Sequence, residues 1–102
     1  MKDIRLKFSP RFSLGRCYIT QGINCLVEQH NLPVIEYLSR HQSGDWGELD
    51  KHDIEANEQA IKEGYRLLSA YSFETRSNDK IKIWIITEAD RSSTTLLLPE
   101  EY

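Results

Sequence analysis

The chain has 102 residues, of which 39% are hydrophobic and 28% are charged, and its formal net charge is −3. These values are typical of a globular protein with one hydrophobic core and exclude a disordered or membrane-embedded chain. No apolar run approaches the roughly 18 residues of a membrane helix, and the N-terminus lacks the apolar core of a signal peptide. We therefore expect one cytoplasmic domain over residues 1–102, without a membrane partner.

The N-terminal part predicts an arm, a strand and a helix. Residues 1–14 are basic and without clear periodicity, which indicates an irregular arm or a short edge strand. Residues 15–20 are rich in β-branched and aromatic side chains and predict a strand. Thr20 can then cap a short helix, since threonine oxygens accept from the first helical N–H groups. The expected buried face of this helix consists of Ile23, Leu26, Val27 and His30.

Two further helices are expected before residue 65, where the spacing of hydrophobic residues changes from that of a helix to that of a strand. Asn31 or Leu32 can cap the second helix, and Pro33 suits its first turn because a proline there loses no hydrogen bond. Its expected apolar side consists of Val34, Ile35, Leu38 and His41. Residues 44–47, Gly-Asp-Trp-Gly, predict a compact turn. The third helix, about residues 50–63, carries acidic residues in its first turns, where the helix dipole favours them, and Gly64 can end it.

From residue 65 the hydrophobic period is two, as in strands. Strands are expected at 65–73, 81–87 and 94–98, with polar turns at 75–79 and 88–93. The order β-α-α-α-β-β-β predicts an α+β fold in which about three helices pack on a small, mainly antiparallel sheet. The last three strands form a meander, and the place of the first strand is open.

Several polar side chains near the second and third helices are of types that bind metals. His41 and Asp45 are followed by His52 and Asp53, and such groups together could hold a divalent ion. Their spacing matches no zinc pattern, and His41 also continues an apolar stripe, as a core histidine bonded to a carbonyl or to Asp45 would. Cys17 and Cys25 likewise match no zinc spacing and are expected to be reduced packing residues. We therefore predict no metal ligands and no cofactor.

Trp46 and the last hairpin loop offer further candidates. Trp46 either plugs the corner between two helices, the commoner role, or is an exposed recognition residue. Glu88 and Asp90 follow a strand in a pattern that can bind Mg²⁺ in nucleases. Alternatively they form a polar turn, in which Asp90 accepts from nearby N–H groups and Arg91 pairs with Glu88. The lysine that would complete a nuclease strand is replaced by arginine.

Charge is distributed unevenly along the chain. The first sixteen residues are basic, and residues 45–63 contain seven acidic residues against two lysines. Both regions are explained by ordinary solvated surface, while the acidic one could also meet a basic partner. Aromatic residues do not alternate with a basic stripe, which argues against nucleic-acid binding. The chain contains no P-loop, no Gly-x-Ser-x-Gly and no His-Glu-x-x-His motif.

Three stretches of the sequence are similar to one protein family. They are Arg-His-Gln-Ser-Gly-Asp-Trp-Gly at 40–47, Arg-Leu-Leu-Ser-Ala-Tyr at 66–71, and the C-terminal stretch at 84–102 that contains Thr-Glu-Ala-Asp-Arg-Ser. They resemble small uncharacterised proteins of bacterial plasmids and integrative conjugative elements, often labelled plasmid-related or restriction-associated. The resemblance runs from Phe12 onward. A fainter likeness, to another plasmid-borne domain, rests on Thr20-Gln21-Gly22 and Glu101-Tyr102.

Neither resemblance supplies a catalytic residue; both imply a mobile-element setting, in which small proteins commonly act by binding.

The leading hypothesis is a non-enzymatic binding protein that modulates a host defence or restriction system by contacting another protein. Its expected binding residues are Asp45, Trp46, Asp53, Glu88, Asp90 and Arg91. The second hypothesis is a small metal-dependent hydrolase or nuclease that uses His41, Asp45, Glu88 and Asp90. The third is a DNA-binding regulator that uses the basic first sixteen residues. The sequence does not indicate an oligomeric state.

Overall fold

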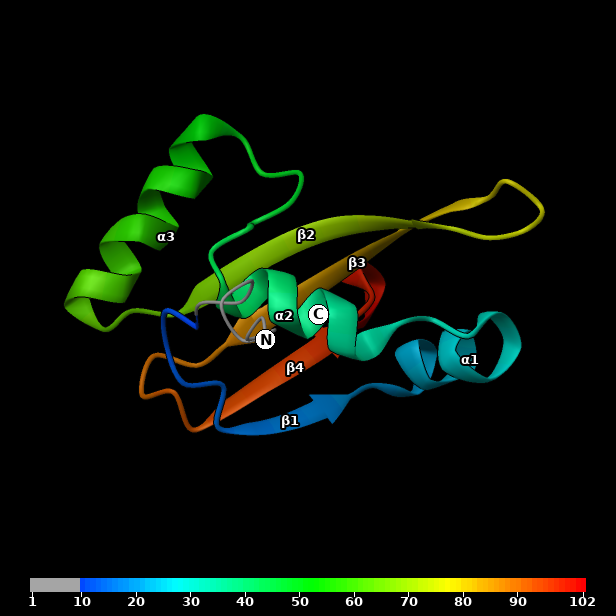
Figure 1. Cartoon of the computed structure of the whole chain (residues 1–102), viewed down its shortest axis with the longest axis horizontal. Helices are drawn as coiled ribbons and strands as arrows, with labels where there is room; N and C mark the ends of the chain where they lie inside the picture. Colours follow the sequence, from blue (N-terminus) through cyan, green and yellow to red (C-terminus); the bar gives the residue numbers. More distant parts are fainter. Residues whose placement is uncertain (1–9) are drawn as a thin grey trace, which may run out of the picture.

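The computed structural model describes residues 10–102 and shows three helices beside a four-stranded mixed sheet (Figure 1). Within these residues, no helix is both long and apolar enough to cross a membrane. The elements in chain order are β1 (Arg16–Ile19), α1 (Gln21–His30), α2 (Val34–Gln42), α3 (Lys51–Glu63), β2 (Leu67–Glu74), β3 (Lys80–Thr87), β4 (Ser93–Leu97) and the 3-10 turn η2 (Pro99–Glu101). The predicted α+β class and the order of its elements are confirmed.

The sheet has the strand order β1-β4-β3-β2. Strands β2, β3 and β4 pair antiparallel and form the expected C-terminal meander. β1 pairs with β4 in parallel, with Arg16 opposite Ser93 and Ile19 opposite Leu96. The place that the sequence left open for the first strand is therefore a sheet edge, and β2 occupies the other edge.

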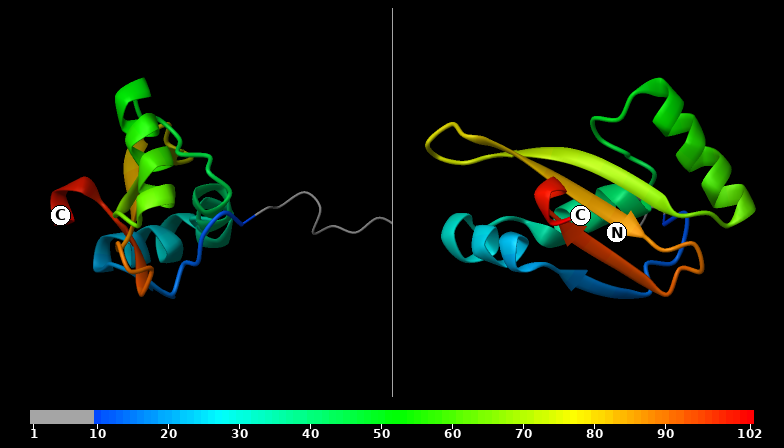
Figure 2. Two further views of the ribbon diagram at one scale, coloured as in Figure 1. Left: turned by 90° about the vertical axis from the view of Figure 1, so that its left-hand side faces the viewer. Right: turned by 180° about the vertical axis from the view of Figure 1, so that it is seen from behind.

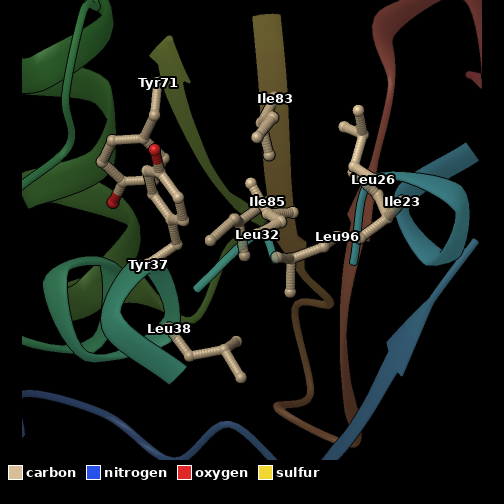
Figure 3. Close-up of a cluster of buried hydrophobic side chains, with 9 residues drawn as sticks. All are labelled: Ile23, Leu26, Leu32, Tyr37, Leu38, Tyr71, Ile83, Ile85 and Leu96. Carbon is tan, nitrogen blue, oxygen red and sulfur yellow. The ribbon is translucent and has the colours of Figure 1, made fainter. Parts of the chain in front are cut away.

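The main core lies on one face of the sheet, between the strands and the first two helices (Figure 3). The sheet contributes Tyr71, Ile83, Ile85 and Leu96, which cross-strand pairing places on the same face. The helical side contributes Ile23, Leu26, Leu32, Tyr37 and Leu38. On the opposite face, η2 brings the ring of Tyr102 to 5.7 Å from that of Trp84, so the C-terminal turn and α2 lie on different sides of the sheet (Figure 2).

The predicted start of α1 and the predicted start and end of α3 agree with the structure. The hydroxyl of Thr20 accepts from the N–H of Ile23 at the start of α1. Asp50 caps α3 and accepts from the N–H of Asp53 at 2.8 Å. Gly64 follows α3 with a φ of 80°, in the left-handed region that glycine adopts without a steric cost.

Several predicted burial positions are wrong. Ile35 is 74% exposed, because the face that α2 buries consists of Tyr37, Leu38 and His41. His30 is exposed at the end of α1, and Tyr65 is 57% exposed before β2 begins. Pro33 directly precedes α2 and is not part of its first turn, so neither Asn31 nor Leu32 caps this helix; Asn31 ends α1 instead. Both cysteines are exposed and unpaired, not packing residues.

Candidate functional site

His41 is fully buried and lies at the centre of a hydrogen-bond chain that crosses the sheet. Nδ1 of His41 contacts the hydroxyl of Ser69 on β2, and Nε2 lies 2.9 Å from the hydroxyl of Thr87 on β3. The Thr87 hydroxyl lies 2.7 Å from that of Thr94 on β4. The Thr94 hydroxyl donates to the carbonyl oxygen of Leu14 at 2.7 Å.

This chain of hydrogen bonds fixes the tautomer of His41. Because Thr94 uses its only hydroxyl proton on Leu14, the Thr87 hydroxyl must donate to Thr94 and accept from His41. Nε2 of His41 therefore carries the proton, and Nδ1 accepts from Ser69. Burial, with a smaller contribution from the charge of Arg91, lowers the pKa of His41 from 6.5 to about 3. The ring is therefore neutral near pH 7, and both of its nitrogens are occupied.

Phe12 is the point at which the two most specific sequence strings meet. Its ring lies 5.2 Å from that of His41 and 6.1 Å from that of Trp46. The guanidinium of Arg91 lies 5.7 Å from the same ring. His41, Trp46 and Arg91 thus converge, but they do so in the interior, since Trp46 is only 4% exposed. Trp46 fills the corner between helices and does not present its ring to a partner in this conformation.

Trp46 also ties α3 to the N-terminal segment. Its indole N–H donates to Glu58 of α3 at 3.0 Å. Arg11 donates to both carboxylate oxygens of Glu58, at 2.8 and 2.9 Å. The hydrogen bonds from Arg11 and then from Trp46 lower the pKa of Glu58 to about 2. One face of α3 is therefore held by a charged bond and an aromatic donor.

Asp45 lies in the expected compact turn. Its carboxylate accepts from Arg40 at 2.7 Å and from the N–H of Gly47 at 3.2 Å. The hydrogen bond from Arg40 lowers the pKa of Asp45. Gly47 has a φ of 76°, and a Cβ there would lie 2.0 Å from the carbonyl oxygen of Ala70, so the loop can run beside β2 only with glycine at this position.

Arg91 in the last hairpin loop joins that loop to the end of α3. It donates to the carbonyl oxygens of Ala60 at 3.0 Å and Tyr65 at 2.7 Å. It also donates to the carbonyl oxygen of Glu88 at 3.1 Å, whereas the sequence suggested a pair with the Glu88 carboxylate. Asp90 accepts from the N–H of Ser92 at 3.0 Å, as expected for a polar turn. Glu88 and Asp90 are both exposed.

The residues of the hydrolase hypothesis do not form a metal site within residues 10–102. His41 is enclosed, Asp45 is bonded to Arg40, and the two hairpin carboxylates are on the surface. The close grouping of potential metal ligands in this range is Asp50, His52 and Asp53, whose ligand atoms lie within 4.8 Å of one another. All three are exposed, and the carboxylate of Asp50 is used as the helix cap.

The two parts of the fainter sequence likeness are in direct contact. The carboxylate of Glu101 accepts from the hydroxyl of Thr20 and from the N–H of Gly22 at 2.9 Å. It also accepts from the N–H of Leu98 at 2.8 Å. A Cβ at Gly22 would lie 2.9 Å from a carboxylate oxygen of Glu101, so glycine permits this approach. The contact links the start of α1 to η2.

Two surface features are available for binding. A polar pocket of about 300 Å³ lies between the end of α1 and the first hairpin, lined by Gln29, His30, Asn31, Phe73, Glu74, Thr75 and Arg76. The second feature is the acidic surface, which we define as the exposed carboxylates of α3 and of the hairpin loop that Arg91 attaches to it. Its members are Asp50, Asp53, Glu55, Glu63, Glu88 and Asp90. Asp45 is exposed in the turn that precedes α3.

Sequence reasoning missed Phe12, Asn57 and the Arg11–Glu58 bond. Phe12 lies in a segment without periodicity, and Arg11 and Glu58 are 47 positions apart. The hydroxyl groups in the hydrogen-bond chain of His41 could have been recognised from the sequence, since Ser69, Thr87 and Thr94 interrupt strand faces that are otherwise apolar. Residues 1–9, which contain most of the basic arm, lie outside the described residues, and Arg11 is bonded to Glu58.

Comparisons with known proteins identify no relative. The chain matches no family model, no curated protein and no solved structure. The resemblance to proteins of mobile elements is therefore a hypothesis that rests on the motifs themselves, and the geometry above is the basis for a function.

Proposed function

We propose that this chain is a non-enzymatic binding protein that contacts a basic surface of another protein through its acidic surface. The observation that carries the proposal is the arrangement of α3, whose inner side is anchored while its outer side displays carboxylates. Asn57 and Ala60 are buried on the anchored side. Glu55 and Glu63 lie on the opposite side of the helix and are exposed.

The anchoring of α3 supports binding because a rigid surface loses little conformational freedom when a partner docks. Glu58 is bonded to Arg11 and Trp46, and Asn57 is bonded to the backbone of β2. Arg91 holds the carbonyl end of the same helix. The backbone positions that carry the α3 carboxylates are therefore fixed. The six carboxylates of the acidic surface outnumber the exposed Lys51 and Lys62 of the same helix, so the net negative charge steers a basic partner toward it.

A binding function is favoured over a catalytic one because the candidate catalytic side chains already make hydrogen bonds that stabilise the fold. Both ring nitrogens of His41 are used inside the core, and its low pKa opposes proton uptake near neutral pH. The carboxylate of Asp45 shapes a turn and pairs with Arg40. These groups stabilise the fold in positions where a hydrolase would need them to face a substrate.

The biological setting in this proposal comes from the motif resemblance. Small proteins carried by plasmids or conjugative elements commonly act by binding to a component of the host. We therefore place the partner among restriction or other defence proteins, many of which have basic surfaces that bind nucleic acid.

The test measures plasmid establishment in bacteria with and without an active restriction or CRISPR system. Expression of the protein should raise establishment in the defended host only. The double variant Glu55→Lys/Glu63→Lys should lose this effect. Captured partner should be released as salt concentration rises, because exposed charges are screened.

The matched control is Glu28→Lys/Glu36→Lys, which makes the same charge change at exposed positions of α1 and α2. It should keep the wild-type effect. If the wild-type protein protects no plasmid and captures no partner, the proposal fails. If both double variants lose the effect equally, net charge and not the acidic surface is responsible.

A further inference from the structure

The two edges of the sheet differ in how their backbone groups are satisfied. At the β2 edge, the side chain of Asn57 donates to the carbonyl oxygen of Leu68 at 2.7 Å and accepts from its N–H at 3.2 Å. The N–H of Ala70 donates to Trp46, and the carbonyl oxygen of Ala70 accepts from Glu48. The loop before α3 and α3 itself thus cover this edge at Leu68 and Ala70, which prevents another strand from pairing with the first half of β2.

The β1 edge has no such cover in the part of the chain that the structure describes. The N–H of Arg16 donates to Ser92 at 3.0 Å, and the N–H of Thr20 donates to Leu96 at 3.2 Å, both toward β4. Because successive residues of a strand direct their backbone groups to opposite sides, Cys17 and Ile19 direct theirs away from the sheet. In the views of Figures 1 and 2, no described segment lies along β1 on the side away from β4.

β1 has only part of the protection that is usual for an edge. Natural edge strands are kept short or carry charged side chains, proline or a bulge to prevent pairing. β1 is short and begins with Arg16, but the rest of the strand is uncharged and contains no proline. β1 has the sequence Arg-Cys-Tyr-Ile, and all four residues are exposed, with Tyr18 at 50% and Ile19 at 40%. Tyrosine and isoleucine are among the residues that favour strands.

We propose that β1 pairs antiparallel with β1 of a second copy of this chain, so that two sheets join into one of eight strands. A twofold axis at Tyr18 places Cys17 of each copy opposite Ile19 of the other. These two residues supply the outward N–H and C=O groups, so four backbone hydrogen bonds form across the axis. Arg16 lies opposite Thr20, and no like charges meet.

A second copy is favoured because this edge is complementary to itself. An isologous contact requires that the same patch serve both partners, and two outward-facing residues separated by one position meet that requirement. The contact is small, because four-residue strands cover far less than the roughly 1,200 Å² of a stable interface. The dimer should therefore be weak, and its population should rise with protein concentration.

The first test uses single cysteines at neighbouring positions in the full chain with Cys17→Ser and Cys25→Ser. Tyr18→Cys places the two thiols at the axis, where opposed Cα atoms lie about 4.5 Å apart, within the range for a disulfide. Ile19→Cys places them diagonally, about 7–8 Å apart, which exceeds that range. Mild oxidation should therefore cross-link the Tyr18→Cys variant severalfold faster than the Ile19→Cys variant. Equal rates, or a faster reaction at position 19, would overturn the proposed register.

The second test uses charge at the same position. Tyr18→Lys places two like charges directly opposite each other and should weaken self-association about fivefold, as should Tyr18→Glu. An equimolar mixture of the two variants should recover association as a mixed dimer, measured by analytical ultracentrifugation. Recovery requires that both variants fold, which their thermal unfolding checks. A wild-type chain that stays monomeric up to millimolar concentration, or a mixture that recovers nothing while both variants are folded, would refute the proposal.

Discussion

The buried imidazole of His41 makes the stability of this fold depend on pH in a specific window. The native pKa of about 3 lies below the ordinary value of 6.5. In the unfolded chain the ring takes up a proton as pH falls through 6.5, whereas the native ring stays neutral. The stabilising effect is therefore complete above pH 6.5 and is lost progressively as pH falls toward 3.

The magnitude follows from proton linkage. One excluded proton changes the free energy of unfolding by ~1.4 kcal/mol per pH unit once the unfolded imidazole is protonated. Between pH 7 and pH 5 the loss attributable to His41 is about 2 kcal/mol. Carboxylates contribute little in this interval, and the low pKa of Glu58 acts mainly at lower pH.

Urea unfolding at several pH values between 5 and 7 measures this loss. His41→Gln lacks a titrating group and keeps an amide that can donate to Thr87, so its free energy of unfolding should be lower but nearly independent of pH. His30→Gln removes an exposed histidine and should keep the wild-type slope. If wild type and His41→Gln show parallel pH dependence, the imidazole is not excluded from protonation and our account of the core is wrong.

Three further predictions concern the attachment of α3 and of the loop before it. Trp46→Phe removes the N–H that bonds Glu58 and also part of the buried indole. Urea unfolding should therefore show a loss of ~2–4 kcal/mol, and a loss below ~1 kcal/mol would contradict both the bond and the packing at this position. Asn57→Leu removes both side-chain hydrogen bonds to Leu68 at the β2 edge. Amide hydrogen exchange at Leu68 should therefore accelerate at least tenfold relative to exchange at the centre of the sheet. Unchanged exchange at Leu68 would contradict the role of Asn57 in covering this edge. Gly47→Ala should lower the free energy of unfolding by more than ~3 kcal/mol, because a Cβ at this position collides with backbone. Gly64 has a similarly positive φ but open space around it, so Gly64→Ala should lower the free energy of unfolding by only ~1 kcal/mol. Similar losses in the two variants would refute the steric argument.

The sequence predicted the parts of the fold that depend on local periodicity and backbone chemistry. Alternation over residues 81–87 located β3, and its turns defined the meander. Thr20, Asp50 and Gly64 marked helix ends because their side chains or their φ values serve those positions directly. Such signals act within a few residues, so they can be recognised without knowledge of the tertiary structure.

The pairing of β1 and the burial of single positions depended on contacts distant in the sequence. β1 and β4 are more than seventy positions apart, and no local pattern says which strand the first one joins. Ile35 is apolar but faces solvent, because the sheet meets Tyr37 and Leu38 instead. Phe12 could not be recognised as a meeting point, because its segment has no hydrophobic period and its partners come from α2, from the loop before α3 and from the last hairpin loop.

The same reasoning changes how the two specific strings should be interpreted. Gly-Asp-Trp-Gly and the string containing Arg91 meet around Phe12 and hold α3 against the sheet, so packing and hydrogen bonding explain the residues at these positions. Substitutions at Trp46 or Arg91 should therefore lower stability and function together, whereas substitutions at Glu55 or Glu63 should lower function alone. A scan that scores both properties separates these classes, and it locates the binding surface on the outer side of α3 only if the second class exists. The most recognisable residues of this chain then explain how the surface is positioned, and less specific acidic residues explain what it binds.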